Sequence, residues 1–154
     1  MNLDQPPIVR AEMLIRSPVA DVFNAFVDPA ITSRFWFTRG SGPLEQGAEI
    51  TWYWDMYGVS ANVKVRSIEQ DLRIVIEWPT RVEWEFLPRG ADATFVRITV
   101  SGFTGSDDEK VAQAIDSMGG FCHLLAGCKA FLEHGIELNL VADHNPDAHV
   151  KAGE

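Results

Sequence analysis

Successive stretches between residues 50 and 100 alternate apolar and polar side chains, and this pattern restricts the fold more than any other feature of the sequence. Alternation with a period of two is typical of strands that bury one face. Turns are expected near positions 57–58, 69–72, 79–81 and 88–92, where they would join the strands as antiparallel hairpins. Because every such pairing keeps the apolar residues together, the sequence predicts an antiparallel sheet with one buried face.

The positions of the turns also predict which residues face one another. A tight turn at Tyr57–Gly58 would place Trp54 opposite Ala61. The other pairs expected on the apolar face are Trp52–Val63, Ile50–Val65, Val65–Ile76, Val63–Trp78, Trp78–Val82, Ile76–Trp84, Trp84–Val96 and Val82–Ile98. The opposite face is expected to carry a row of charges that flank one another across strands, formed by Lys64, Glu77, Glu83 and Arg97.

The segment before this sheet predicts one more strand and two short helices. Residues 9–15 alternate in the same way, which indicates a half-buried strand. The pairs Ser17–Pro18 and Asp28–Pro29 are typical of helix starts, because a proline fits the first helical position.

A long helix is expected after residue 105. Ser106 and Glu109 have the spacing of a capping box, and Gly135 is a candidate for the end of the helix. The apolar stripe between these points rotates by roughly 70° across Gly119–Gly120. One straight helix facing one sheet would not need such a rotation, so we expect a kink or break at the two glycines.

The order of these elements predicts an α+β fold in which the long helix covers the apolar face of the antiparallel sheet. With 154 residues, the chain has the usual size of one domain. We therefore expect a single domain over residues 1–154, with a core at about 8–136 and a polar tail at 137–154 that is ordered only where it docks.

Charge and composition argue against several classes of protein. Thirteen basic and twenty-two acidic residues give a net charge of −9, which disfavours nucleic-acid binding, and no apolar run is long enough for membrane insertion. The first residues lack the pattern of a secretory signal, so a cytoplasmic protein is expected. Cys122 and Cys128 lie about 9 Å apart along a helix, too far for a disulfide.

The common catalytic and cofactor motifs are missing from the sequence. It contains no nucleophile elbow, P-loop, zincin or dinucleotide-binding pattern, so we expect no cofactor. Cys122, Cys128 and His134 fall on different helix faces, and His144, Asp147 and His149 lie in the tail, so we expect no metal centre. His123 falls on the polar helix face near Asp116 and is expected to be solvated.

The apolar sheet face is unusually rich in tryptophan, which fits either a bulky core or a pocket beneath the helix. Ala61, a small residue facing a large one, favours the pocket. Its expected lining is Trp36, Trp52, Trp54, Met56, Ala61, Val63, Trp78, Trp84, Phe86, Met118, Cys122 and Leu125. This set has no titratable group apart from the thiol, so acid–base chemistry would have to come from the rim, where the candidates are Arg34, Arg39 and Asp55.

A resemblance to a known family covers roughly residues 8–136. The sequence resembles homologues of the heat-shock protein 90 ATPase activator, in the START-like (SRPBCC, polyketide cyclase-like) superfamily. The matching positions are Ser17–Pro18, Val22–Phe23, Ala25–Phe26, Asp28–Pro29, Phe35–Trp36, Gly120–Phe121, Leu125, Lys129, Leu132–Glu133 and Gly135. Phe121 stands where the family commonly has Trp, and Cys128 where it commonly has Leu. The resemblance implies a helix-grip fold, with an antiparallel sheet wrapped around a long C-terminal helix and enclosing a hydrophobic cavity.

Three functions remain open at this point. The first is a small-molecule binding protein that holds an apolar or aromatic ligand between sheet and helix. The second is an enzyme of cyclase, isomerase or hydratase type, using Asp55 or Arg39 from the rim of the same cavity. The third is a module that contacts a chaperone through an exposed face. A filled core would favour the third, because only the first two need a cavity. The broad apolar arc of the long helix also leaves a homodimer open.

Overall fold

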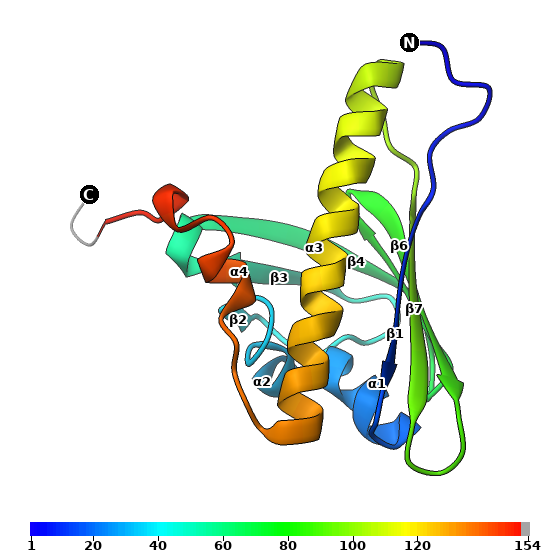
Figure 1. The fold of residues 1–154 in the computed structure, drawn as a ribbon, viewed down its shortest axis with the longest axis vertical. Coiled ribbons are helices and arrows are strands. Elements are labelled where there is room, and N and C mark those ends of the chain that lie inside the picture. The colour runs from blue at the N-terminus through cyan, green and yellow to red at the C-terminus, as the bar shows by residue number, and fades with distance from the viewer. Residues whose placement is uncertain (152–154) are drawn as a thin grey trace.

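The computed structural model describes residues 1–151 and shows an α+β fold built on one antiparallel sheet (Figure 1). The seven strands follow the order β1-β7-β6-β5-β4-β3-β2. They are β1 (Val9–Ile15), β2 (Arg39–Gly40), β3 (Glu49–Trp54), β4 (Val59–Glu69), β5 (Arg73–Trp78), β6 (Thr80–Pro88) and β7 (Thr94–Ser101). The helices are α1 (Val19–Val27), α2 (Pro29–Thr32), α3 (Asp107–His134) and α4 (Leu140–Asp143), with short 3-10 turns η1 (Asp55–Tyr57) and η2 (Pro146–Ala148).

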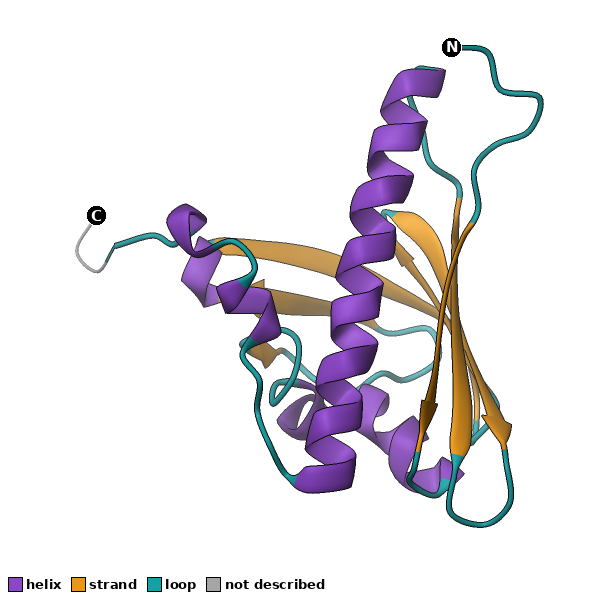
Figure 2. Ribbon diagram, in the orientation of Figure 1, coloured by secondary structure: helices purple, strands orange, loops and turns teal. Residues whose placement is uncertain are grey.

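The long helix α3 crosses one face of this sheet, and α1 and α2 lie beneath its C-terminal end (Figure 2). The face toward α3 carries the core, whose buried side chains include Trp52, Trp84 and Phe86 from the sheet and Leu124 and Leu125 from the helix. This arrangement is the predicted helix-grip architecture, so the fold class is confirmed. No helix within residues 1–151 is both long enough and apolar enough to cross a lipid bilayer.

The predicted faces of the sheet are correct, but three of the four predicted registers differ by two residues. Ala61 lies opposite Trp52, because the β3–β4 connection contains η1 and is centred one residue earlier than a turn at 57–58. Val82 likewise pairs with Ile76, and Trp84 with Ile98. Val65 does pair with Ile76 as expected, and a bulge follows. A shift of two residues leaves each side chain on its original face, which is why the core survives the error.

The outer face carries the expected charges, joined by ion pairs across strands. Glu77 pairs with Arg66 at 2.7 Å and lies opposite Lys64. Glu83 contacts Arg73 and, at 3.4 Å, Arg81. A third group joins Arg97 to Glu12 of β1 at 3.2 Å and to Glu85 of β6 at 3.9 Å. In each pair at least one side chain is about a third or more exposed to solvent, so the pair contributes little to stability.

The predicted break at Gly119–Gly120 is wrong, because α3 is continuous over 28 residues. Ser106 caps its start by accepting a hydrogen bond from the Glu109 amide, and Gly135 ends it in a left-handed conformation. The stripe rotates for a different reason. The first turns of α3 extend past the strands (Figure 2). Ile115 and Met118 are 70% and 41% exposed, so these apolar residues do not belong to the face of α3 that packs on the sheet. The buried face of α3 begins only at Phe121.

Candidate ligand-binding cavity

A cavity of about 510 Å³ lies between the middle of α3, strands β3 to β6 and the chain around α4. Its size falls in the range of small-molecule sites. The lining residues come from segments far apart in the sequence, and they are Trp36, Trp54, Tyr57, Val59, Ser60, Ala61, Trp78, Pro79, Thr80, Val82, Phe103, Gln113, Asp116, Ser117, Gly120, Phe121, His123, Val141 and His144. Three walls can be distinguished: an aromatic wall, a polar wall from α3, and a wall from the tail.

The aromatic wall is formed by three tryptophans from different parts of the chain. Trp54 of β3 and Trp78 of β5 stack with their ring centroids 5.4 Å apart and an interplanar angle of 11°. Trp36, which follows α2, stands edge-on to Trp78 at 5.4 Å and to Trp54 at 6.0 Å. Phe121 of α3 extends the cluster, 6.1 Å from the Trp36 ring. Such rings fix one another by edge and stacking contacts, so the wall is preformed.

The helix α3 contributes the polar wall through Gln113, Asp116, Ser117 and His123. These positions recur at helical spacing, which places them on one side of the helix. The Gln113 amide already donates to the carbonyl of Thr104 at 2.7 Å. Asp116 is solvent-exposed at the cavity wall and forms no ion pair with any residue between 1 and 151. His123, expected to be solvated, is half-buried and lines the cavity.

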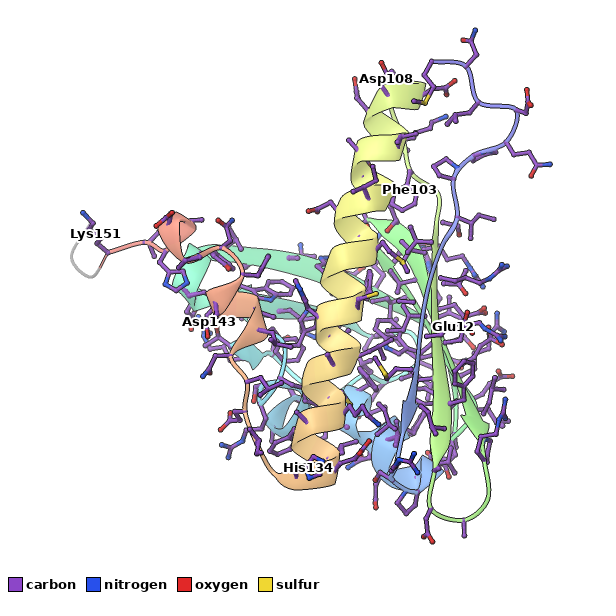
Figure 3. All side chains as sticks on the ribbon, viewed as in Figure 1. Glu12, Phe103, Asp108, His134, Asp143 and Lys151 are labelled. Atoms are coloured by element: carbon purple, nitrogen blue, oxygen red, sulfur yellow. The ribbon has the colours of Figure 1, made fainter. Side chains whose placement is uncertain are left out.

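The third wall is the tail, whose residues show no hydrophobic period. After His134 the chain turns back beside α3 toward Asp143 and Lys151 (Figure 3). The hydroxyl of Tyr57 donates a hydrogen bond to the carbonyl of Val141, and the amide of Val150 donates to the carbonyl of Met56 at 2.9 Å. Both bonds fasten the tail to the β3–β4 connection, so Val141 and His144 reach the cavity.

The tail wall contains a tyrosine with a shifted pKa and a contact between two histidine rings. Burial raises the pKa of Tyr57, and the nearby Asp143 carboxylate raises it further. The phenol therefore stays protonated and able to donate at neutral pH. The rings of His144 and His123 lie 5.3 Å apart, so the tail meets α3 at the edge of the cavity.

The structure divides the predicted lining into four groups. Trp36, Trp54, Ala61 and Trp78 line the cavity together. Five others are at most 2% exposed and form the core beneath it: Trp52, Val63, Trp84, Phe86 and Leu125. Met56 lines a second cavity of about 190 Å³ under the tail. Met118 is 41% exposed and Cys122 is half-buried, and neither lines the main cavity.

The predicted rim residues lie outside the main cavity and are already paired. Arg39 and Asp55 form an ion pair at 3.2 Å, and the Arg39 guanidinium lies over the ring of Tyr53. Arg34 pairs with Glu137 at 3.8 Å and lines the second cavity. The titratable groups that do line the main cavity are Tyr57, Asp116, His123 and His144. Sequence periodicity placed Asp116 and His123 together on α3, but it could not show that the tail encloses that side of the helix.

Cysteine and metal chemistry find little support in the described part of the chain. Cys122 and Cys128 are both free thiols. Burial of Cys128 raises its thiol pKa well above the ordinary value, which makes it a packing residue and not a nucleophile. No group of three or more His, Cys, Asp or Glu side chains within residues 1–151 is arranged to hold a metal ion.

A sheet that wraps a long C-terminal helix and leaves a cavity between them defines a START-like protein of the helix-grip class. Residues 16–132 match the family model described as Activator of Hsp90 ATPase homolog 1-like protein. The chain therefore belongs to this family, as its resemblance predicted. The comparison with curated proteins gave no match.

Solved structures with the same fold include three of particular interest. Protein SSP2350 from Staphylococcus saprophyticus is 28% identical, with a TM-score of 0.77 over 86% of this chain and 96% of that one. The Aha1 dimer from Colwellia psychrerythraea is 17% identical, with a TM-score of 0.70 over 84% and 98%. DynU16, from the dynemicin biosynthetic locus, is 20% identical, with a TM-score of 0.70 over 84% of this chain and 48% of that one. At these identities the last two show the fold alone.

Proposed function

We propose that this protein binds a small apolar or aromatic molecule in the main cavity. The observation that carries the proposal is the preformed wall of Trp36, Trp54 and Trp78 beside a space of about 510 Å³. Flat aromatic surfaces held rigid before binding cost little further entropy when a ligand stacks on them. The cytoplasmic location inferred from the sequence remains a prediction.

A fluorescent ligand tests the proposal directly. N-phenyl-1-naphthylamine is uncharged and brightens in apolar surroundings, and we expect it to bind wild-type protein with saturable fluorescence. Ala61→Trp should fill the part of the cavity that Ala61 lines and weaken dye binding by at least about tenfold while the protein stays folded. Asn62→Trp adds the same ring at an exposed position outside the cavity and serves as the matched control.

Two outcomes would overturn the proposal. The first is an absence of saturable dye binding to the wild type. The second is unaltered dye binding in Ala61→Trp together with a melting temperature lowered by several degrees, which an overpacked core would produce. Native mass spectrometry of gently purified protein provides an independent readout, because a retained small molecule would appear as added mass that Ala61→Trp lacks.

A second candidate is an enzyme that uses the same cavity. Asp116 and His123 of α3 and His144 of the tail line it, so groups able to move protons border the space where a substrate would stack. These three residues are the candidates for acid–base catalysis in place of the predicted Asp55 and Arg39, which pair with each other outside the cavity. Here His123→Gln should retain a molecule that differs in mass or in fragmentation pattern from that retained by the wild type. Identical retained molecules would favour the pure binding function.

The hypothesis of a module that contacts a chaperone has less support, because it leaves the cavity without a role.

A homodimer is a separate proposal. The Colwellia psychrerythraea neighbour was solved as a dimer. For the present chain, a homodimer would cover the exposed Ile115 and Met118 of α3. Light scattering after size exclusion tests this proposal, and a monomer at all concentrations would contradict it.

A further inference from the structure

The main cavity carries a strongly one-sided set of charges. Among its described lining residues, Asp116 is the only carboxylate, and neither lysine nor arginine is present. The other polar groups are hydroxyls, one amide and two imidazoles: Tyr57, Ser60, Thr80, Gln113, Ser117, His123 and His144. An anionic ligand would find no fixed positive charge here.

The charges just outside the cavity do not reverse this bias. Asp143 on α4 is close enough to Tyr57 to raise its pKa, so the tail brings a second carboxylate to the same region. The arginines of the neighbouring strands lie on the outer face, where Arg66 pairs with Glu77 and Arg73 pairs with Glu83. The whole chain carries a net charge of −9, which also repels anions and attracts cations.

The aromatic wall acts in the same direction. Tryptophan is the side chain whose ring attracts cations best, and Trp36, Trp54 and Trp78 come together here. An ammonium group near these rings and the Asp116 carboxylate would gain two favourable interactions. A carboxylate in the same position would lose its hydration and meet a like charge.

We propose that the cavity selects planar aromatic molecules that are neutral or carry an amine, and excludes those that carry a carboxylate or sulfonate. This inference rests on the proposed binding function and adds the chemical class of the ligand. Asp116 is the selecting residue, because it is the only formally charged acid on the wall. The hydroxyls of Ser60, Thr80 and Ser117 are available to the polar edges of such a ligand.

Three matched competitors separate charge from shape. 1-Naphthylmethylamine, 1-naphthylmethanol and 1-naphthoic acid share one ring system and are cationic, neutral and anionic. Each is titrated against protein-bound N-phenyl-1-naphthylamine in the same buffer at about pH 8, where a free amine carries a positive charge and a free carboxylic acid a negative one. We expect the amine and the alcohol to displace the dye at concentrations at least about tenfold lower than the acid.

Two variants assign the effect to Asp116. Asp116→Asn should reduce the difference between amine and acid to less than about threefold, since the fixed charge is gone. Asp108→Asn removes one charge from the same helix at an exposed position outside the cavity, and it should keep the wild-type preference. An equal change in both variants would show that net charge alone steers the ligands, against a role of Asp116 as the selecting residue.

The outcomes also separate this inference from the proposed function. If the acid displaces the dye as well as the amine does, the charge preference is overturned while the binding function stands. If the dye binds but Asp116→Asn leaves the preference unchanged, selection by Asp116 is overturned. If the dye itself fails to bind, the proposed function fails and the inference with it.

Discussion

Gly127 of α3 packs directly on Phe35, the residue that precedes the cavity tryptophan Trp36. A Cβ atom at position 127 would lie 3.2 Å from both the Cβ and the carbonyl oxygen of Phe35. Such a contact is tighter than ordinary packing, and the carbonyl belongs to backbone that cannot rotate away. The close approach of the α3 backbone to Phe35 therefore lies about two turns after Gly119–Gly120, where the sequence predicted a break.

Substituting alanine for the packed glycine Gly127 and for the open glycine Gly119 should have opposite effects on the stability of the protein. Gly127→Ala should destabilise the protein by about 1–3 kcal/mol, because the added methyl group is forced against Phe35. Gly119→Ala meets nothing within 4 Å, and it should stabilise α3 by up to about 1 kcal/mol through higher helix propensity. Urea unfolding measures both changes. A stabilised Gly127→Ala would show that α3 and Phe35 separate without cost.

The faces of the elements could be predicted from the sequence because they depend on periodicity. The two-residue register errors left Trp54 and Ala61 on the same face, so the aromatic composition of that face was correct. The depth of each residue depends on curvature and on what covers the sheet, which periodicity does not encode. Trp52 and Trp84 share a face with Trp54, yet they lie in the core beneath the cavity.

The polar half of the site could not be predicted for a related reason. Asp116 and His123 lie on a face of α3 that is hydrophilic in sequence and would be solvated on an isolated sheet–helix pair. They line a cavity because residues 137–151 return beside them and fasten to Tyr57 and Met56. That return has no hydrophobic period, and its hydrogen bonds use backbone groups that every residue possesses.

The outer charges of the sheet should be irrelevant to binding. Glu83→Gln removes the partner of Arg73 and Arg81 on the face away from the cavity, and we expect a stability loss of about 1 kcal/mol. Dye affinity should stay within about twofold of wild type, since no cavity residue changes. A fluorescence titration measures this affinity, and a tenfold loss would mean that the outer face takes part in binding.

Glu133 should make stability depend on acid pH. Burial acts to raise its pKa, but hydrogen bonds from the Arg16 amide and the Lys129 ammonium outweigh burial and lower it. A carboxyl group whose pKa is lowered by folding stabilises the protein fully at pH values above its ordinary pKa of 4.5. This contribution is lost as the pH falls through the pKa of the folded state. Glu133→Gln should therefore cost about 1–3 kcal/mol at neutral pH, and this cost should shrink as the pH falls below 4.5 toward about 3.

Urea unfolding at the two pH values checks this expectation. Glu137→Gln is the matched control, because that carboxylate is 47% exposed and pairs with Arg34 at 3.8 Å. It should change stability by no more than about 0.5 kcal/mol at either pH. A cost of Glu133→Gln that is equal at both pH values would show that the side chain acts by packing and not by charge.

The hydrogen bond from Tyr57 to Val141 should control docking of the tail. Tyr57→Phe removes the donor, so amide exchange at Val150, whose N–H bonds to Met56, should accelerate by about fivefold at neutral pH. A tyrosine whose folded pKa is raised contributes stability that is complete below its ordinary value of 10.0 and lost as the pH rises through the folded pKa. The difference in melting temperature between wild type and Tyr57→Phe should therefore shrink above about pH 10.

The control for the exchange measurement is Tyr53→Phe. It removes a phenol that lies under Arg39, outside the cavity, and should leave Val150 exchange unchanged. Equal Val150 protection in wild type and Tyr57→Phe would mean that the tail docks through its other contacts alone.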